Sequence, residues 1–279
     1  MKSVYIILLN WRGWRDTIRC LSSLVSLNYS NYRVIVVDNA SGDESVERIK
    51  TAFPEIMLIS NNENVGFGSG CNVGIRHALA NGADYVWLLN NDTIVDPNAL
   101  DSLVQRAESD NSIGAVGSVL HPMGGDVINI QAWGGGCVKN YLGISRHFVG
   151  PVSECRIQYL TGASLLLPAS TLKSVGLFDE NYFMYWEDTD LGIRIGKMGY
   201  KLAVAPKSHI WHKESASLGR TNPRLDYYFT SSSIRFFRKH SGIPLIPIGI
   251  SLGGRLAKRI FSWKWRNVGE IINAITDEI

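Results

Sequence analysis

Residues 4–9 (VYIILL) and 33–38 (RVIVVD) are the two short apolar runs that decide the fold. Both are rich in branched side chains and precede a segment with helical periodicity, as the strands of a βαβ unit do. The first helix is expected over 15–27, where one face collects four apolar residues: Ile18, Leu21, Leu24 and Val25. The second is expected after Ser41, because this residue or Asp43 can cap exposed amides.

The alternation of strands and helices continues along the first half of the chain. Strands are expected over 57–60 and 85–89, with a helix over 71–81 between them. Strands that are apolar on both faces and alternate with helices predict a parallel sheet with helices on each side. Ligands bind such sheets at the carboxyl ends of the strands, so the residues that follow the strands are the candidates for a site.

The second half departs from this pattern. Residues 124–150 are rich in glycine and carry short strand-like pieces, which predicts antiparallel additions. The other expected elements are helices over 97–109 and 188–198 and strands over 113–120, 164–167 and 201–205. No repeat or linker divides the chain, so we expect three parts: 1–110 and 111–218 as halves of one α/β domain, and 219–279 as a helical basic region.

Composition and charge narrow the class of protein. The 279 residues are 45% hydrophobic and 19% charged, which excludes collagen, coiled coil and bulk disorder. The four cysteines form no C-x-x-C pair, and the apolar runs at 4–9 and 243–252 are shorter than the ~20 residues that span a bilayer. We therefore expect a cytoplasmic protein with reduced thiols.

The basic residues gather near the carboxyl end. Ten of the 28 Lys and Arg residues lie in 220–266, where Asp226 is the single acidic residue. Within 253–271 they alternate with tryptophan and other apolar residues, which suits peripheral binding to the anionic inner face of a membrane. A helix packed on the main domain, or on a second subunit of a homodimer, is the alternative. Nothing else resembles a nucleic-acid-binding module.

Two polar loops suggest phosphate chemistry. Residues 64–72 (NVGFGSGCN) resemble the G-x-G-x-x-G dinucleotide fingerprint, but its last position falls on Cys71 or Val73, and the loop follows the third strand instead of the first. An NAD-type oxidoreductase is therefore the weaker hypothesis. Residues 90–92 (NND) end an apolar strand, where Asp92 can hold a divalent cation between phosphates or form an ordinary turn.

Residues 187–190 (EDTD) open a helix behind the aromatic run 182–186. Carboxylates at a helix start can simply cap it, but the helix dipole also keeps them ionised, as a general base requires. The aromatic run is either core or a platform for a sugar ring. His209 and His212 follow the last strand without the partners of a zinc site, although one of them can complete the site that begins with Asp92.

The order of these motifs resembles that of bacterial family 2 glycosyltransferases of the GT-A fold, and especially their rhamnosyltransferase-like members. The resemblance covers about residues 3–240 and is carried by eight motifs: 7–11 (ILLNW), 36–43 (VVDNASGD), 64–72, 88–93 (LLNNDT), 161–163 (TGA), 176–180 (GLFDE), 186–191 (WEDTDL) and 212–217 (HKESAS). It implies a Rossmann-like mixed, mainly parallel sheet flanked by helices.

The resemblance also implies roles for single residues. Asp38 is expected to read the base of a nucleotide diphosphate sugar, together with the backbone near Leu9 and Asn10. The loop residues expected to shape the nucleotide pocket are Asn64, Gly66 and Asn72. Asn90, Asn91 and Asp92 take the place of the family's D-x-D motif.

Asp92 is then the residue that binds Mg²⁺ or Mn²⁺, His212 is a further metal ligand, and Asp188 is the catalytic base. Two positions depart from the family pattern. Asn90 replaces an acid, which leaves one carboxylate fewer for the cation, and serines stand at 231 and 232 where similar proteins often carry an Arg-Asn pair.

The implied function is inverting transfer of a sugar from dTDP-rhamnose or a UDP-sugar to a hydroxyl of a glycan or lipid-linked acceptor in cell-surface polysaccharide synthesis. A non-catalytic sugar-nucleotide-binding protein of the same fold is the alternative. The sequence leaves open the sugar, the base, the acceptor and the oligomeric state.

Overall fold

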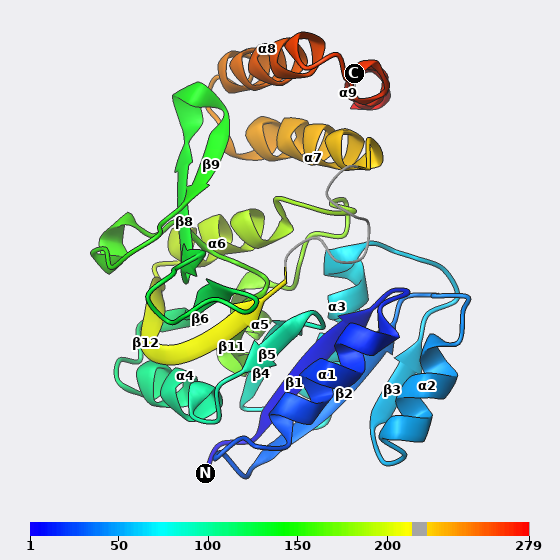
Figure 1. The fold of residues 1–279 in the computed structure, drawn as a ribbon. Helices are drawn as coiled ribbons and strands as arrows, with labels where there is room; N and C mark the ends of the chain where they lie inside the picture. The colour runs from blue at the N-terminus through cyan, green and yellow to red at the C-terminus, as the bar shows by residue number, and fades with distance from the viewer. Residues whose placement is uncertain (214–221, 279) are drawn as a thin grey trace.

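The computed structural model describes residues 1–213 and 222–278. The expected domain boundary at 218 and the motif residues Ser215 and Ser217 lie outside the described residues. Within the described part, a nine-stranded sheet forms the centre of the molecule, in the order β3-β2-β1-β4-β11-β6-β12-β5 with β7 beside β6 (Figure 1). Its strands are β1 (Val4–Asn10), β2 (Tyr32–Asp38), β3 (Met57–Ser60), β4 (Tyr85–Asn90), β5 (Thr93–Val95), β6 (Ile113–Pro122), β7 (Ala132–Trp133), β11 (Ser164–Pro168) and β12 (Lys201–His212).

The sheet is mixed and mainly parallel, as expected. β1 pairs in parallel with β2 and β4, β2 with β3, and β6 with β12. β11 runs antiparallel between β4 and β6, and β5 runs antiparallel to β12. The carboxyl ends of β1, β2 and β4 consequently meet at one edge, where their loops collect.

Helices cover both faces of the sheet because its central strands are apolar on both sides. In β1, Ile6 and Leu8 face one core while Tyr5 and Ile7 face the other. The first core contacts α1 (Trp14–Leu24), α2 (Ser45–Ala52) and α4 (Ala99–Glu108), and the second contacts α3 (Phe67–Ala80), α5 (Ala169–Val175) and α6 (Glu187–Lys197).

Two local predictions are corrected, and of the two expected capping residues one is observed. α1 ends at Leu24 because the chain turns there, so Val25 lies outside the helix and is 70% exposed. Asp43 accepts a hydrogen bond from the Ser45 amide, while the Ser41 hydroxyl is used elsewhere. β12 continues through a bulge after Ala205 to residue 212, so the two histidines expected after the strand lie within it.

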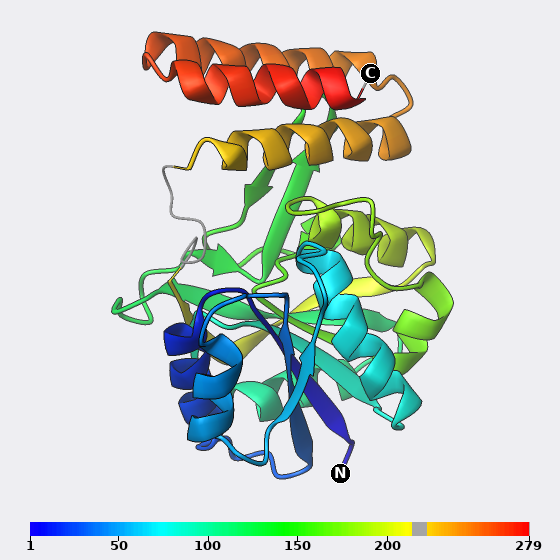
Figure 2. The ribbon, with the colours of Figure 1, turned by 90° about the vertical axis from the view of Figure 1, so that its right-hand side faces the viewer.

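The glycine-rich segment forms antiparallel strands, as expected. β8 (Gly135–Lys139) pairs with β9 (Ile144–His147) and with β10 (Tyr159–Leu160), and two short helices flank them, η1 (Asn140–Leu142) and η2 (Glu154–Arg156). The β8–β9 hairpin extends from the sheet to the carboxyl-terminal helices (Figures 1 and 2).

Those helices form a separate layer: α7 (Arg224–His240), α8 (Leu245–Phe261) and α9 (Trp265–Glu278). α7 is part of the protein core, because Phe236 and Phe237 pack against Tyr182 and Trp186. α8 and α9 lie outside α7 (Figure 2). Among the described helices, none has the length and apolarity needed to cross a membrane.

Candidate active site

A cavity of about 340 Å³ lies at the carboxyl edge of the sheet. Its walls come from the ends of β1 and β4, the loop before α3, the start of α6, the hairpin and the last residue of β12. The expected residues that line it are Leu9, Asn64, Gly66, Asn90, Asn91, Asp92, Asp188 and His212. The expected metal-binding and catalytic residues therefore share one cavity.

Two larger hollows, of about 730 and 590 Å³, lie elsewhere on the surface. Neither brings Asp92, Asp188 or His212 together. We assign the site by its convergent titratable groups, since volume alone does not identify chemistry.

A buried chain of polar side chains connects the ends of β1, β2 and β4. Asn10 donates to Asp38 Oδ1 at 2.7 Å, and the Thr17 hydroxyl donates to Asn10 Oδ1 at 2.8 Å. Asn91 Nδ2 donates to Thr17 Oγ1 at 2.9 Å. Ser41 completes the chain by donating to Asp38 through its hydroxyl and its amide. These bonds fix three loops relative to one another.

Three expected donor-binding residues are not in the cavity wall: Asn10, Asp38 and Asn72. Asp38 is 3% exposed, and both its oxygens accept hydrogen bonds from neighbours, because a short carboxylate at a strand end turns back onto the following amides. Asn72 bonds the backbone amide and carbonyl of Phe178 and the Glu180 carboxylate. It therefore holds the segment before α6 against α3.

The loop before α3 is held by amide side chains. Asn39 Nδ2 donates to Asn64 Oδ1 at 2.8 Å and to the Gly66 carbonyl at 3.0 Å. Gly66 has φ +86°, and a Cβ there would collide with the Phe183 carbonyl, so only glycine fits this contact. The glycines thus allow the aromatic segment to approach the loop.

β-sheet register brings His212 to Asp92. In the antiparallel pair of β12 and β5, His212 lies opposite Thr93, the residue that follows Asp92. His212 Nε2 is 3.3 Å from Asp92 Oδ1 and 3.3 Å from Asn90 Nδ2. The two predicted ligands are 120 residues apart in sequence and adjacent in space.

These side chains fit a divalent cation. Asn90 Oδ1 and His212 Nδ1 are buried with no hydrogen-bond partner among the described residues. A carboxylate and an imidazole are donors that suit Mn²⁺ and related ions. The described residues contain no cluster of three or more His, Cys, Asp or Glu that could bind a metal, so a cation here would need oxygens from substrate and water.

Asp188 lies in the first turn of α6. Its Oδ2 accepts the Gly162 amide at 3.0 Å, and its Oδ1 accepts the amide of Thr189 at 2.6 Å. The adjacent Glu187 is 6% exposed, and its Oε2 is buried with no partner among the described residues.

Burial acts on both carboxyl groups. Burial, with the nearby Asp188, raises the pKa of Glu187 to about 8. Burial also raises the pKa of Asp188, but the hydrogen bonds from Gly162 and Thr189 and the nearby His147 oppose this rise. Since like charges resist ionising together, the geometry favours an ionised Asp188 beside a protonated Glu187.

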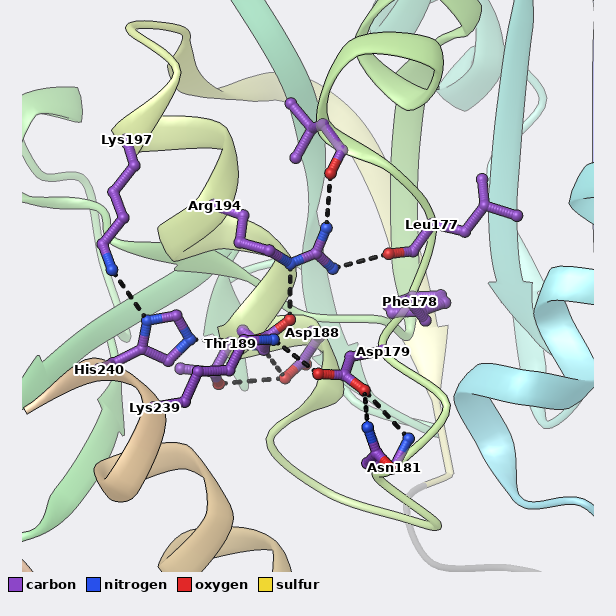
Figure 3. A network of polar contacts seen from close by, with 12 residues as sticks. Leu177, Phe178, Asp179, Asn181, Asp188, Thr189, Arg194, Lys197, Lys239 and His240 are labelled. Carbon is purple, nitrogen blue, oxygen red and sulfur yellow. Dashed lines mark hydrogen bonds and ion pairs between the residues drawn. The ribbon is translucent and has the colours of Figure 1, made fainter.

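Asp190, two residues further along α6, has the opposite surroundings, since its partners include Arg194, Lys239 and His240, which are labelled in Figure 3. It is fully buried and contacts Arg194 Nε at 2.7 Å, Lys239 Nζ at 2.8 Å and His240 Nε2 at 2.7 Å. Arg194 also donates to the Val175 and Leu177 carbonyls. Asp190 therefore joins α6 to the end of α7 and to the loop after α5.

The backbone before Glu187 is strained. Tyr185 and Trp186 have φ of +69° and +68°, in the left-handed region that large side chains rarely adopt. Trp186 is held there by α7, since its ring lies 4.6 Å from Phe236. The neighbouring Phe183 ring stacks on Tyr228, also at 4.6 Å. α7 thus stabilises the conformation that turns Glu187 and Asp188 into the cavity.

Several cavity residues carried no predicted role: Trp11, Asn39, Phe67, His147, Thr161 and Gly162. Asn39, Thr161 and Gly162 occur in the motifs of the sequence resemblance, so these motifs could have identified them as residues of the site. His147 had no such signal, because it reaches the cavity through the hairpin.

The chain is similar in sequence to known glycosyltransferases. The family model Glycosyl transferase family 2 matches residues 3–151. A relative from Mycobacterium tuberculosis, N-acetylglucosaminyl-diphospho-decaprenol L-rhamnosyltransferase, is 28% identical over 267 residues, which covers 86% of each chain. Poly-beta-1,6-N-acetyl-D-glucosamine synthase of Staphylococcus aureus is 27% identical over 217 residues, which covers 73% of this chain and 48% of the relative.

A solved structure supports the fold. The mannosyltransferase PcManGT from Pyrobaculum calidifontis, in complex with GDP-Man and Mn²⁺, superposes with a TM-score of 0.64 at 18% identity, over 99% of this chain and 74% of that one. The family model spans more than half of the chain, and the sheet has the expected architecture. The chain therefore belongs to glycosyl transferase family 2 and is a rhamnosyltransferase-like glycosyltransferase of the GT-A fold.

Proposed function

We propose that this glycosyltransferase transfers a sugar from a nucleotide diphosphate sugar to an acceptor hydroxyl by a single inverting displacement. The observation that supports this most strongly is the placement of Asp188 and the Asp92–His212 pair in the wall of one cavity. A base for the acceptor and ligands for a diphosphate site then serve the same reaction centre.

Asp188 is the proposed general base. It accepts the proton of the acceptor hydroxyl as that oxygen attacks the anomeric carbon. The Gly162 amide holds the carboxylate in place. The raised pKa of Glu187 keeps this residue protonated at neutral pH. A neutral Glu187 does not repel the negative charge of Asp188, so Asp188 can stay ionised. One carboxylate is sufficient, because the leaving diphosphate needs charge stabilisation instead of a proton.

The donor is proposed to lie between the end of β1 and the loop before α3. Leu9, Asn64 and Gly66 line that side of the cavity. Asp38 and Asn10 do not line the cavity. Their hydrogen bonds fix the loop after β2, against which the nucleotide base of the donor would lie. This assigns them a positioning role in place of the expected direct contact.

Asp92 and His212 are the proposed ligands of Mn²⁺ or Mg²⁺, with Asn90 and Asn91 beside them. The unpartnered Asn90 Oδ1 and the carboxylate–imidazole pair are the features that support a cation here. When bound, a divalent cation would neutralise charge on the departing diphosphate.

The names of the relatives guide the choice of substrates. The mycobacterial relative is a rhamnosyltransferase named for a lipid diphosphate acceptor, and the staphylococcal one makes a polysaccharide. We propose dTDP-rhamnose or a UDP-sugar as donor and a lipid-linked or glycan acceptor of cell-surface polysaccharide synthesis.

Thermal-shift measurements with UDP-, dTDP- and GDP-sugars, with Mn²⁺ or with EDTA, test the proposal. A donor present at about 100 Kd should stabilise the fold by ~2.7 kcal/mol. The shift should depend on Mn²⁺ in the native chain and lose that dependence in Asp92→Ala and His212→Ala. Asp96→Ala, a carboxylate beyond β5, is the matched control. Equal donor affinity in EDTA and Mn²⁺ would remove the metal assignment.

Product analysis separates the enzyme from its non-catalytic alternative. Mixing the stabilising donor with a polyprenyl diphosphate sugar should give a glycosylated lipid with inverted anomeric configuration. Donor binding without turnover on lipid-linked and glycan acceptors would favour a sugar-nucleotide-binding protein of the same fold.

A further inference from the structure

α8 has its polarity reversed relative to an ordinary surface helix. Its inward face carries the charged residues Arg255 and Arg259, whereas the opposite face presents Ile246, Ile250 and Ile260, all exposed. Their spacing of four and ten residues places these isoleucines on one side of the helix. Exposure of apolar side chains to water is unfavourable, and an exposed apolar helix face of this kind marks a site of interaction with an apolar partner.

The two inward-facing arginines of α8 form ion pairs with one buried aspartate. Asp226, 2% exposed at the start of α7, contacts Arg255 at 2.6 Å and Arg259 at 2.8 Å, and Asn267 of α9 donates to it at 2.6 Å. These two arginines therefore do not belong to an exposed basic surface, which corrects the expectation for 253–271. The cluster fixes which side of α8 faces outward.

The corner between α8 and α9 carries aromatic and basic side chains together. Phe261 is 84% exposed and Trp263 78% exposed, and Trp265 is exposed beside them. Lys258, Lys264 and Arg266, all exposed, remain as its cations. None of the salt bridges found among the described residues includes these three. Exposed tryptophan beside unpaired cations is the side-chain combination found at the interface of anionic bilayers.

The tip of the β8–β9 hairpin, residues 141–143, lies beside α8 and carries further exposed apolar side chains. Gly143 lies so close to the Pro247 carbonyl of α8 that a Cβ would collide with it. Next to it, Tyr141 is 80% exposed and Leu142 is also exposed. The hairpin, α8, α9 and the residues between these two helices hold eleven of the nineteen large exposed apolar side chains in the described residues. The apolar exposure is therefore concentrated on one part of the molecule.

The same hairpin leads to the active site. Its strand β9 ends at His147, which lines the cavity, about 13 Å of extended chain from Gly143. An acceptor whose lipid lies in a membrane under α8 could present its head group near that cavity. This connection rests on the proposed function, whereas the surface itself does not.

We propose that the outward face of α8, the aromatic corner at 261–266 and the hairpin tip form a docking surface for an anionic lipid bilayer. Ile246 and Ile250 enter the interface, and Lys258, Lys264 and Arg266 contact lipid phosphates. The surface lies on the bilayer and does not cross it. A second copy of the chain on this face is the competing occupant.

Flotation of the full chain with vesicles tests the proposal. The chain should float with phosphatidylcholine vesicles that contain phosphatidylglycerol at low salt, and less with pure phosphatidylcholine. The double variant Ile246→Glu/Ile250→Glu should reduce vesicle partitioning by about tenfold or more. Ile128→Glu, which charges another exposed isoleucine away from this surface, should float like the native chain.

Circular dichroism and sedimentation separate the other outcomes. Both variants should keep the native helix content and melting temperature, since the changed side chains are exposed. If the α8 variant unfolds, Trp263→Ser/Trp265→Ser should show the same loss of flotation. Equal flotation of the native chain and the Ile246→Glu/Ile250→Glu and Trp263→Ser/Trp265→Ser variants, or no flotation of the native chain, would overturn the proposal. A native dimer that α8 substitution dissociates, without vesicle binding, would assign the face to a second copy. Donor binding should be unchanged in every variant, so failure here is distinct from failure of the proposed function.

Discussion

Asp188 and Asp190 are two residues apart on α6 and have opposite electrostatic surroundings. Asp188 faces the cavity and accepts hydrogen bonds from backbone amides, no salt bridge found among the described residues includes it, and burial raises its pKa. Burial would also raise the pKa of Asp190, but hydrogen bonds from His240, Lys239 and Arg194 outweigh it and lower that pKa to about 2. Burial alone therefore does not set the charge of a carboxylate; its partners do.

Within one turn of α6, this difference distinguishes the proposed general base, Asp188, from a carboxylate with a structural role, Asp190. A carboxylate with a raised pKa can accept a proton near neutral pH, whereas one held by the cationic groups of Arg194 and Lys239 cannot. Asp190 instead fixes the helix that carries Asp188, through its contacts with Lys239 and His240. Four measurements can break or sharpen this comparison.

The largest expected effect is that of Asp188→Asn on turnover. Loss of a general base typically reduces the rate by about 10² to 10⁴. The amide keeps the shape of the side chain, so donor affinity and melting temperature should stay near native values. Steady-state kinetics and donor titration check this. Full turnover in Asp188→Asn, together with inactive Glu187→Gln, would move the role to Glu187.

Asp190→Asn should instead reduce stability. Removing the acid leaves Arg194 and Lys239 without their buried partner, at a cost of about 3 kcal/mol in the free energy of unfolding. Urea denaturation measures this loss. Asp110→Asn, which breaks an exposed ion pair with Lys201, is the control and should reduce stability far less than Asp190→Asn. A fully stable Asp190→Asn with impaired turnover would contradict the structural role.

The contacts of Asp190 should also affect the pH dependence of stability, by a smaller amount than the substitution does. Asp190 has a folded pKa of about 2, below its ordinary value of 3.8. Its contribution of about 2 kcal/mol is fully present above pH ~4 and is lost as the pH falls towards 2. Unfolding free energies at stepped pH should fall less steeply in Asp190→Asn over this interval. Identical pH profiles would sink the assignment.

The smallest expected effect is a shift in the acid limb of activity. Because burial raises the pKa of Asp188, kcat/KM should fall with decreasing pH at a midpoint above 3.8, as the base becomes protonated. Glu187→Gln should leave this midpoint nearly unchanged, because the raised pKa of Glu187 keeps that group neutral over the pH range in which Asp188 titrates. A midpoint that moves to lower pH in Glu187→Gln would show that Glu187 carries charge beside Asp188.

The sequence was sufficient to predict the early strands and the helices α1 to α4 and α6. β1 and β2 are apolar on both faces, so their period and length determine buried parallel strands. The polar loops after them follow from topology, since parallel strands end at one edge. Asp92 and Asp188 could be predicted on this basis, because each lies directly at the end or start of a strong element.

Other site features could not be predicted from local pattern. Asp38 and Asn72 looked like wall residues but are turned inward by neighbours that only the folded loops supply. His147 reaches the cavity because a hairpin of weak, glycine-rich pattern extends beside it. The tail looked uniformly basic, although two of its arginines face Asp226.

The sequence by itself determined the α/β class, the family resemblance and the residue types of the reaction centre, because these depend on local periodicity and motif order. Only the tertiary structure decided which carboxylate is paired, which histidine meets Asp92 and which face of α8 is apolar. These depend on contacts between residues far apart in the chain, as when strand register brings His212 to Asp92 and α7 brings His240 to Asp190. Such contacts set desolvation and charge pairing, and no local pattern in the sequence specifies them.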